Sequence, residues 1–239
     1  MIGIFDSGSG GLTFYNEVKK LLPEYDYIYF WDYKNCPYGN KNSQEIIQLT
    51  TEGVLKLKNA GVKIIILACN TATANAIKIL QKNEKILWVK ILGVTIPWAE
   101  KIFDLRCKKV VIFATKSSVN SLVYTKRIHL LDENIQVQEI ALPELAGFIE
   151  QFLQKKISRD FLEKYIQKTV GKIDFSVDAI VLGCTHYSYI IDIFEKIFPQ
   201  QKIVNPSYES ALRFVSYLER HPEIEKMLSK NQKFINISW

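Results

Sequence analysis

The feature that most constrains this chain is a junction that occurs twice, in which a short apolar run stops at a cysteine. The first copy reads Ile-Ile-Ile-Leu-Ala-Cys-Asn-Thr over residues 64–71, and the second reads Ala-Ile-Val-Leu-Gly-Cys-Thr over residues 179–185. Each copy predicts a buried strand that leads into a helix. Open α/β sheets bind their ligands at the carboxyl ends of parallel strands, so Cys69 and Cys184 are candidate site residues.

Apolar runs alternate with helical patterns along the rest of the chain. Strands are expected near residues 2–5, 26–31, 64–67, 88–92, 110–113, 135–140, 179–182 and 202–204. Helices are expected between them, including one that ends near 131, one that runs from the second cysteine motif to about 198, and one from 206 to 220, before a charged, weakly patterned tail. We expect an α/β protein of two pseudo-symmetric open parallel-sheet domains, with the active site in the cleft between them.

Composition and charge exclude several function classes. The formal charge of +6 over 239 residues comes from scattered lysines, which favours a solvated surface over a nucleic-acid patch. No apolar run reaches the roughly 18 residues of a membrane span and no signal peptide is recognised, so a cytoplasmic protein without a membrane partner is expected. Four cysteines without a C-x-x-C pair, and three histidines, argue against a metal site and a disulfide framework. Cys36 and Cys107 lack the junction context and are interpreted as structural.

Other polar residues also follow predicted strand ends. Asp6-Ser-Gly-Ser-Gly-Gly11 follows the first strand, and its glycines permit close backbone approach to a ligand. This loop is not a dinucleotide-binding fingerprint, because Thr13 occupies the third glycine position, and it is not a P-loop, because no Gly-Lys-Ser/Thr follows. Thr115 comes directly after a later strand and supplies another wall of the same kind of site.

The chemistry of a thiol shows what else the two cysteines need. A free thiol has a pKa of ~8.5, so a thiolate near neutral pH requires roughly 2–3 kcal/mol. A helix N-terminus supplies ~0.3–1 kcal/mol, or up to ~2 kcal/mol when partly buried. A further charge or proton acceptor is therefore required, and Asp6 and His186, which lies two residues after Cys184, are the candidates within the motifs.

Taken together, the motifs resemble those of the glutamate racemases in the cofactor-independent aspartate/glutamate racemase superfamily. The resemblance spans nearly the whole chain and is carried by Asp6-Ser-Gly with Gly10-Gly11, Pro37-Tyr-Gly39 with Lys41, Ala68-Cys-Asn-Thr-Ala72, Ala114-Thr115 with Ser121 and Tyr124, and Leu182-Gly-Cys-Thr-His-Tyr187. It implies interconversion of L- and D-glutamate without pyridoxal phosphate or any other cofactor, supplying D-glutamate for peptidoglycan.

The resemblance also implies roles for individual residues. Cys69 and Cys184 match the two proton-transferring cysteines, with Cys69 acting on D-glutamate and Cys184 on L-glutamate. The matches at the remaining positions are Asp6 and Ser7 for substrate binding and proton relay, Pro37, Tyr38 and Gly39 for a binding loop, Asn70, Thr71, Thr115 and Thr185 for substrate contacts, and Glu150 with His186 for support of Cys184. A homodimer is implied as well, and so is a discontinuous first domain of residues 1–94 plus 206–239 around a second domain of residues 95–205.

Two other interpretations stay open. An aspartate or broad-specificity amino-acid racemase would share the same cysteines, although Thr185-His186 favours glutamate because aspartate racemases of the superfamily usually carry Thr-Glu there. A non-catalytic amino-acid-binding protein or a thiol redox protein on the same fold is the alternative of a different class. The chain also departs from the family pattern at Gly93-Val-Thr-Ile-Pro97, Leu142-Pro143 and Asn205-Pro206, and none of these changes removes a catalytic atom.

Overall fold

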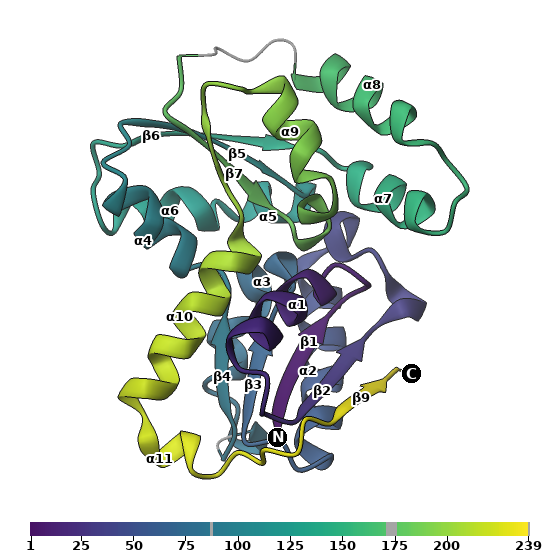
Figure 1. Ribbon diagram of the computed structural model, residues 1–239, viewed down its shortest axis with the longest axis vertical. Helices are drawn as coiled ribbons and strands as arrows, with labels where there is room; N and C mark the ends of the chain where they lie inside the picture. Colours follow the sequence, from purple (N-terminus) through teal and green to yellow (C-terminus); the bar gives the residue numbers. More distant parts are fainter. Residues whose placement is uncertain (87, 171–175, 239) are drawn as a thin grey trace.

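The computed structural model describes residues 1–86, 88–170 and 176–238, and these form two lobes that are each built around one sheet (Figure 1). The first sheet has the strand order β4-β3-β1-β2-β9, and the second has the order β6-β5-β7-β8. Every strand pair in both sheets is parallel. The expected α/β class with two parallel sheets is therefore confirmed.

The first sheet draws its elements from both ends of the chain. Its strands are β1 (Ile2–Asp6), β2 (Tyr27–Trp31), β3 (Ile64–Leu67), β4 (Lys90–Gly93) and β9 (Phe234–Ile237). The accompanying helices are α1 (Leu12–Leu21), α2 (Ser43–Asn59), α3 (Asn70–Leu80), α10 (Pro206–Arg220) and α11 (Pro222–Glu225), with 3₁₀ turns η1 (Tyr33–Asn35), η2 (Tyr38–Asn40) and η3 (Glu84–Ile86).

Side chains of the first sheet alternate between two apolar layers, as the period of two in a strand requires. On one face Ile4 and Tyr29 pack with Phe14 of α1 and Phe214 of α10. The opposite face packs against α2 and α3, where Phe5 belongs to the second apolar cluster. Because both faces are covered, the strands read in the sequence as nearly continuous apolar runs.

The second sheet is covered in the same way. Its strands are β5 (Lys109–Ala114), β6 (Gln136–Ala141), β7 (Ala179–Gly183) and β8 (Lys202–Val204). The helices are α4 (Pro97–Asp104), α5 (Lys116–Ser121), α6 (Val123–His129), α7 (Leu145–Leu153), α8 (Arg159–Val170) and α9 (Ile191–Ile197), with the 3₁₀ helix η4 (Thr185–Ile190) after β7. One apolar cluster contains residues of α7, α8 and α9, and the other contains residues of α4 and α6. We propose that the two sheets mark two domains with the boundaries expected from the sequence.

Helix starts that the sequence marks with capping residues form as expected. The Asn42 side chain accepts a hydrogen bond from the backbone N–H of Glu45 at 2.9 Å, at the start of α2. Asn205 accepts from the backbone N–H of Ser207 at 3.0 Å, and Pro206 is the first residue of α10. None of the helices in the described part of the chain is long and apolar enough to cross a membrane.

Three local expectations are wrong. The helix expected to end near 131 is divided by Leu122, which adopts φ +52° between α5 and α6, and Glu139 accepts from the backbone N–H of Thr125 in the first turn of α6 at 2.9 Å. The residues after Cys184 form a 3₁₀ helix before α9 begins.

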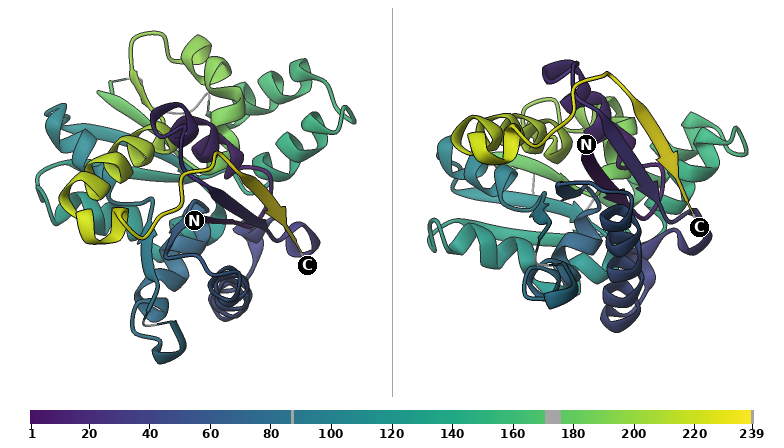
Figure 2. Two further views of the ribbon diagram at one scale, coloured as in Figure 1. Left: turned by 60° about the horizontal axis from the view of Figure 1, so that its bottom comes forward. Right: turned by 90° about the horizontal axis from the view of Figure 1, so that it is seen from below.

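The tail contains β9, which lies beside β2 at the edge of the first sheet (Figure 2). An edge strand such as β9 is exposed, so its sequence has little apolar pattern. It forms a strand because it pairs with a distant segment of the chain.

The tail is held to the first sheet by the buried carboxylate of Asp26. Its Oδ1 accepts from the backbone N–H groups of Asn231 and Lys233, both at 2.9 Å, and its Oδ2 accepts from the Asn231 side chain at 2.8 Å. Burial by itself would raise the pKa of Asp26, but these bonds together with one from Ser229 outweigh it and hold the pKa well below its usual range. The charged form is therefore the one that fixes the tail.

Replacing Asp26 by alanine is expected to destabilise the protein by about 2–3 kcal/mol at pH 7, because several N–H donors lose a charged acceptor. Since the folded-state pKa lies below the unfolded value of ~3.9, this contribution is present above pH ~4 and is lost as the pH falls further. Thermal denaturation at pH 7 and pH 5 should show the same deficit, and hydrogen exchange should be faster in β9.

Asp132→Ala is the matched control. Asp132 also accepts a backbone N–H, from Asn134 at 2.9 Å, but this turn is exposed. Its substitution should change stability by no more than about 0.5 kcal/mol. Equal effects of the two substitutions would show that Asp26 does not anchor the tail.

Candidate active site

Each sheet contributes two neighbouring strand ends to the site. In the first sheet Asp6 ends β1 and Cys69 follows the adjacent strand β3. In the second sheet Thr115 follows β5 and Cys184 follows the adjacent strand β7. Parallel strands end at one edge of a sheet, so each pair is brought together by topology.

Hydrogen bonds join the carboxyl edges of the two sheets. The Thr185 hydroxyl donates to Asp6 Oδ2 at 3.3 Å. The Thr71 and Thr115 hydroxyl oxygens lie 2.9 Å apart. The two halves of the sequence motif therefore meet in one buried site, and Cys184 is near enough to Cys69 to raise the pKa of the Cys69 thiol.

Cys69 caps helix α3 with its sulfur. The Sγ atom accepts from the backbone N–H of Ala72 at 3.4 Å and lies 3.4 Å from the hydroxyl of Ser7. Burial and the nearby carboxylate of Asp6 raise the pKa of the Cys69 thiol to about 12, although the bonds to Ser7 and Ala72 act in the opposite direction. Before a ligand binds, Cys69 is therefore a protonated thiol, and a cationic ligand would favour the thiolate.

Cys184 has a different environment, formed by an imidazole and a carboxylate in series. Its Sγ lies 3.8 Å from His186 Nδ1, and His186 Nε2 lies 2.7 Å from Glu150 Oε1. Burial lowers the pKa of His186, but Cys184, Glu150 and Asp6 outweigh it and raise that pKa to about 10. His186 is therefore an imidazolium at neutral pH, which stabilises negative charge on a nearby sulfur.

Glu150 is held in its charged form by donors from both sheets. Its Oε1 accepts from the backbone N–H of Ser9 at 3.0 Å and from the Ser9 hydroxyl at 2.8 Å. Burial raises the pKa of Glu150, but His186 and Ser9 outweigh it and lower that pKa to about 2. The carboxylate thus fixes the orientation of the His186 ring.

Asp6 is a carboxyl group poised to exchange a proton near neutral pH. It is fully buried and accepts from the backbone N–H of Gly8 at 2.8 Å. Burial raises the pKa of Asp6 to about 6, while the charge of His186 and the bonds from Gly8 and Thr185 limit the shift. Groups with such a pKa in a buried site are candidates for general acid–base chemistry.

The amide of Asn70 points to a missing polar ligand. Asn70 is only 2% exposed, and neither its Oδ1 nor its Nδ2 has a hydrogen-bond partner among the residues that the structure describes. An unpaired buried polar group costs about 1–3 kcal/mol, so a native protein rarely tolerates one without a functional reason. A ligand that carries both donors and acceptors would satisfy this amide.

The segment Pro37-Tyr38-Gly39 lies against the second sheet. A Cβ atom on Gly39 would come within 2.8 Å of the Thr115 side chain, so only glycine permits this approach. The Tyr38 hydroxyl donates to Asp32 Oδ2 at 2.7 Å, and its ring is buried in the same apolar cluster as Phe5. Tyr38 therefore positions the segment, while Pro37 is half-buried beside it.

Two residues at the site were not predicted from the sequence. Ser9 is part of the glycine-rich loop, but its bonds to Glu150 depend on a partner 141 positions away. Cys36, interpreted as structural, places its Sγ 4.0 Å from Glu150 Oε1 at the site, and its position before Pro37-Tyr-Gly39 was the available signal. Cys107, by contrast, belongs to an apolar core cluster under the second sheet.

The protein is an α/β protein in which two parallel sheets face each other and each carries a cysteine at a strand end. Comparison with known proteins shows its family. The family model described as Asp/Glu/Hydantoin racemase matches residues 2–207. The glutamate racemase of Campylobacter concisus is 36% identical over 91% of this chain and 82% of its own length. The chain belongs to the Asp/Glu/Hydantoin racemase family.

Solved structures agree with this assignment. A glutamate racemase isoform from Bacillus anthracis matches with a TM-score of 0.87 and 28% identity, covering 100% of this chain and 87% of the other. The Francisella tularensis glutamate racemase in complex with D-glutamate also has a TM-score of 0.87, with 30% identity over 99% of this chain and 87% of the other. The family resemblance noted in the sequence is confirmed.

Proposed function

We propose that this protein is a glutamate racemase that interconverts L- and D-glutamate with two thiols and no cofactor. The observation that carries the proposal is the placement of Cys69 and Cys184 at matched strand ends of two facing sheets. The relatives named glutamate racemases, and the related structure that contains D-glutamate, support this substrate.

In the proposed mechanism one thiolate removes the α-proton while the opposite thiol donates a proton to the other face. The cysteines exchange these roles when the substrate enantiomer changes. The substrate ammonium would supply the positive charge that Cys69 requires to ionise. His186, held by Glu150, would supply that charge beside Cys184.

The orphaned amide of Asn70 would bind the α-carboxylate or the ammonium group of the amino acid. Thr71, Thr115 and Thr185 offer hydroxyl groups nearby, and the N-terminus of α3 favours a carboxylate. Asp6, with its raised pKa, would relay a proton or pair with the ammonium group. Ser7 would assist Cys69 through the contact described above.

The buried state of the site has a consequence for substrate entry. Cys69 and Cys184 are only 5% and 6% exposed, and Asp6 is fully buried. We propose that the two sheet units separate to admit the amino acid and close to exclude water, which strengthens electrostatic interactions in the site.

A chiral assay on the purified protein tests the function and separates it from its alternatives. We expect racemisation of L-glutamate and D-glutamate, with L-aspartate turned over much more slowly. If aspartate were turned over faster than glutamate, aspartate would be the substrate and the proposed glutamate specificity would be wrong. Binding of glutamate without racemisation of any amino acid would instead indicate a binding protein on this fold.

We further propose that the enzyme acts in the cytoplasm, supplies D-glutamate for peptidoglycan and assembles as a homodimer. Family membership supports these three points. Light scattering tests the last one, and a mass equal to the single 27.6 kDa chain at working concentration would contradict the dimer.

A further inference from the structure

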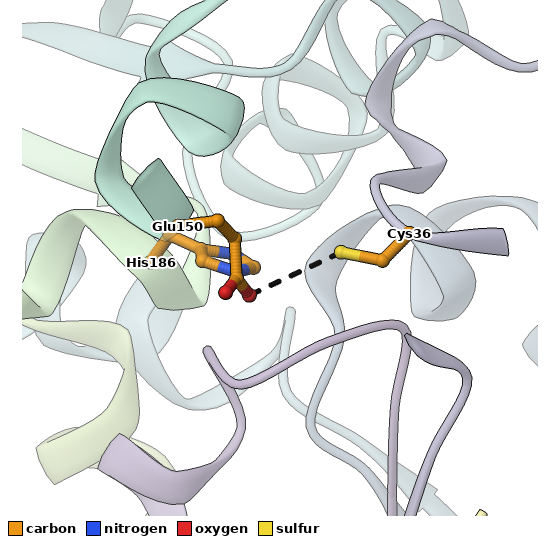
Figure 3. Close-up of side chains that lie close together, drawn as sticks. All are labelled: Cys36, Glu150 and His186. Atoms are coloured by element: carbon orange, nitrogen blue, oxygen red, sulfur yellow. Dashed lines mark hydrogen bonds and ion pairs between the residues drawn. The ribbon is translucent and has the colours of Figure 1, made fainter. Parts of the chain in front are cut away.

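A thiol, a carboxylate and an imidazole converge at the edge of the site. Cys36 Sγ lies 4.0 Å from Glu150 Oε1, and one ligand atom from each of Cys36, Glu150 and His186 lies within 4.8 Å of the other two. Figure 3 shows the Cys36 sulfur pointing toward the carboxylate and the ring from the opposite side of the site. The three residues belong to three separate segments of the chain, so sequence spacing could not reveal the group.

We propose that Cys36, Glu150 and His186 form a binding site for a zinc-type divalent cation and that occupation of this site inhibits the enzyme. Sulfur, imidazole nitrogen and carboxylate oxygen are the donors that zinc prefers. Three protein ligands leave a fourth position for water. The inhibitory part rests on the proposed racemase function, whereas the binding part does not.

Two of the three distances between ligand atoms can be compared directly with those that a tetrahedral ion requires, and the third, between Cys36 and His186, is at most 4.8 Å. Zinc–ligand bonds of about 2.0–2.3 Å place neighbouring ligand atoms about 3.3–3.6 Å apart. Glu150 Oε1 and His186 Nε2, now 2.7 Å apart, would have to separate slightly, and Cys36 Sγ would have to approach the carboxylate slightly from 4.0 Å. The backbone N–H and hydroxyl of Ser9, which donate to Glu150 Oε1, would have to move aside or share this oxygen with the ion.

The three ligands approach one another closely beside Gly8. A Cβ atom on Gly8 would lie 2.5 Å from Cys36 Sγ and 2.9 Å from Glu150 Oε1, so a larger residue would block the approach between these two ligands. Cys36 is half-buried and also lines a surface depression together with Asn35, Pro37 and Asn40. The depression, which Lys34 and Lys41 also line, is the side on which Cys36 is open to solvent.

Binding requires the loss of two protons to solvent, one from the Cys36 thiol and one from His186 Nε2. The ion then takes the place of the hydrogen bond between His186 and Glu150. The other ring nitrogen, Nδ1, still faces Cys184 at 3.8 Å. With the ion bound at Nε2, His186 is no longer the imidazolium that supports Cys184. Racemisation therefore slows, even though neither proton-transferring cysteine is a ligand.

Titration with Co²⁺ tests the binding without relying on activity. Ligation by a thiolate gives a sulfur-to-cobalt charge-transfer band in the near ultraviolet, and Zn²⁺ should displace it. Cys36→Ser is expected to weaken Co²⁺ binding by at least about tenfold and to abolish the band. Cys107→Ala, which changes a core cysteine far from the group, should leave the band unchanged. A band that survives Cys36→Ser but disappears in Cys69→Ala would place the ion between the two proton-transferring thiols and overturn the proposal.

Activity provides the second measurement, with each variant compared with its own metal-free rate. Saturating Zn²⁺ should lower the rate of the unmodified protein at least about tenfold, a chelator should restore it, and Cys36→Ser should be insensitive at the same concentration. Binding that leaves racemisation unchanged would overturn the inhibitory part. If no amino acid is racemised, the proposed function fails, and the cobalt band still decides whether the ion site exists.

Discussion

Replacing either Cys69 or Cys184 by alanine is expected to lower glutamate racemisation by at least about 10³-fold in both directions without unfolding the protein. Each variant lacks one of the two groups that must act in a single turnover, either the base on one face or the acid on the other. The measurement is the initial rate from each enantiomer, with thermal denaturation to check the fold. Cys107→Ala is the matched control, because Cys107 is a buried cysteine in an apolar core and should keep near-normal turnover.

Solvent deuterium distinguishes two thiols from a single base. In D₂O the donor thiol exchanges with solvent before substrate binds, so newly formed product should carry deuterium at Cα while unreacted substrate at first keeps its hydrogen. Any exchange that survives in a single-cysteine variant should be confined to one enantiomer, and the other variant should favour the opposite one. Return of the original proton into product, or near-normal turnover of either variant, would mean that one group serves both faces.

Substitution of Gly10 by alanine is expected to have the second largest effect, lowering activity by at least about 10²-fold and stability by about 1–3 kcal/mol. A Cβ atom at this position would lie 2.4 Å from Thr185 Oγ1 and 2.7 Å from His186 Nδ1. The glycine loop must therefore move away from the second sheet, and this displaces the bonds from Thr185 to Asp6 and from Ser9 to Glu150. Kinetics together with thermal denaturation measure the two effects.

Gly147→Ala provides the matched comparison. Gly147 lies within helix α7, and a Cβ atom there would have no neighbour within 4 Å in the described part of the chain outside its own helix backbone and adjacent residues. Alanine favours a helix over glycine, so this variant should gain up to about 1 kcal/mol of stability and retain activity. If Gly10→Ala behaved like Gly147→Ala, the close packing of the glycine loop on Thr185 and His186 would be irrelevant to function.

The two thiols are chemically unequal, although the strand–cysteine junctions that carry them are alike. Cys69 contacts a hydroxyl and a backbone N–H, and the nearby carboxylate of Asp6 opposes its ionisation. Cys184 faces an imidazolium that Glu150 holds in place. We therefore expect substrate charge to matter more for activating Cys69 than for activating Cys184.

Features that depend on local patterning could be predicted from the order of the amino acids. Apolar runs predicted the strands that lead to Asp6, Cys69, Thr115 and Cys184, and capping residues predicted the starts of α2 and α10. These predictions succeed because strand periodicity and helix capping are set by residues within a few positions of one another. The family motifs then linked the strand ends to a common chemistry.

Only the tertiary structure decided which distant groups meet and what burial does to them. The pairing of β9 with β2 joins residues about 200 positions apart, and its exposed edge leaves little pattern in the sequence. The position of Cys36 beside Glu150, and the raised pKa of Asp6, also depend on contacts between segments that the sequence keeps far apart. Burial and long-range contacts are properties of the packed chain, so the electrostatics of the site and its candidate ion site emerge only when the two sheets face each other.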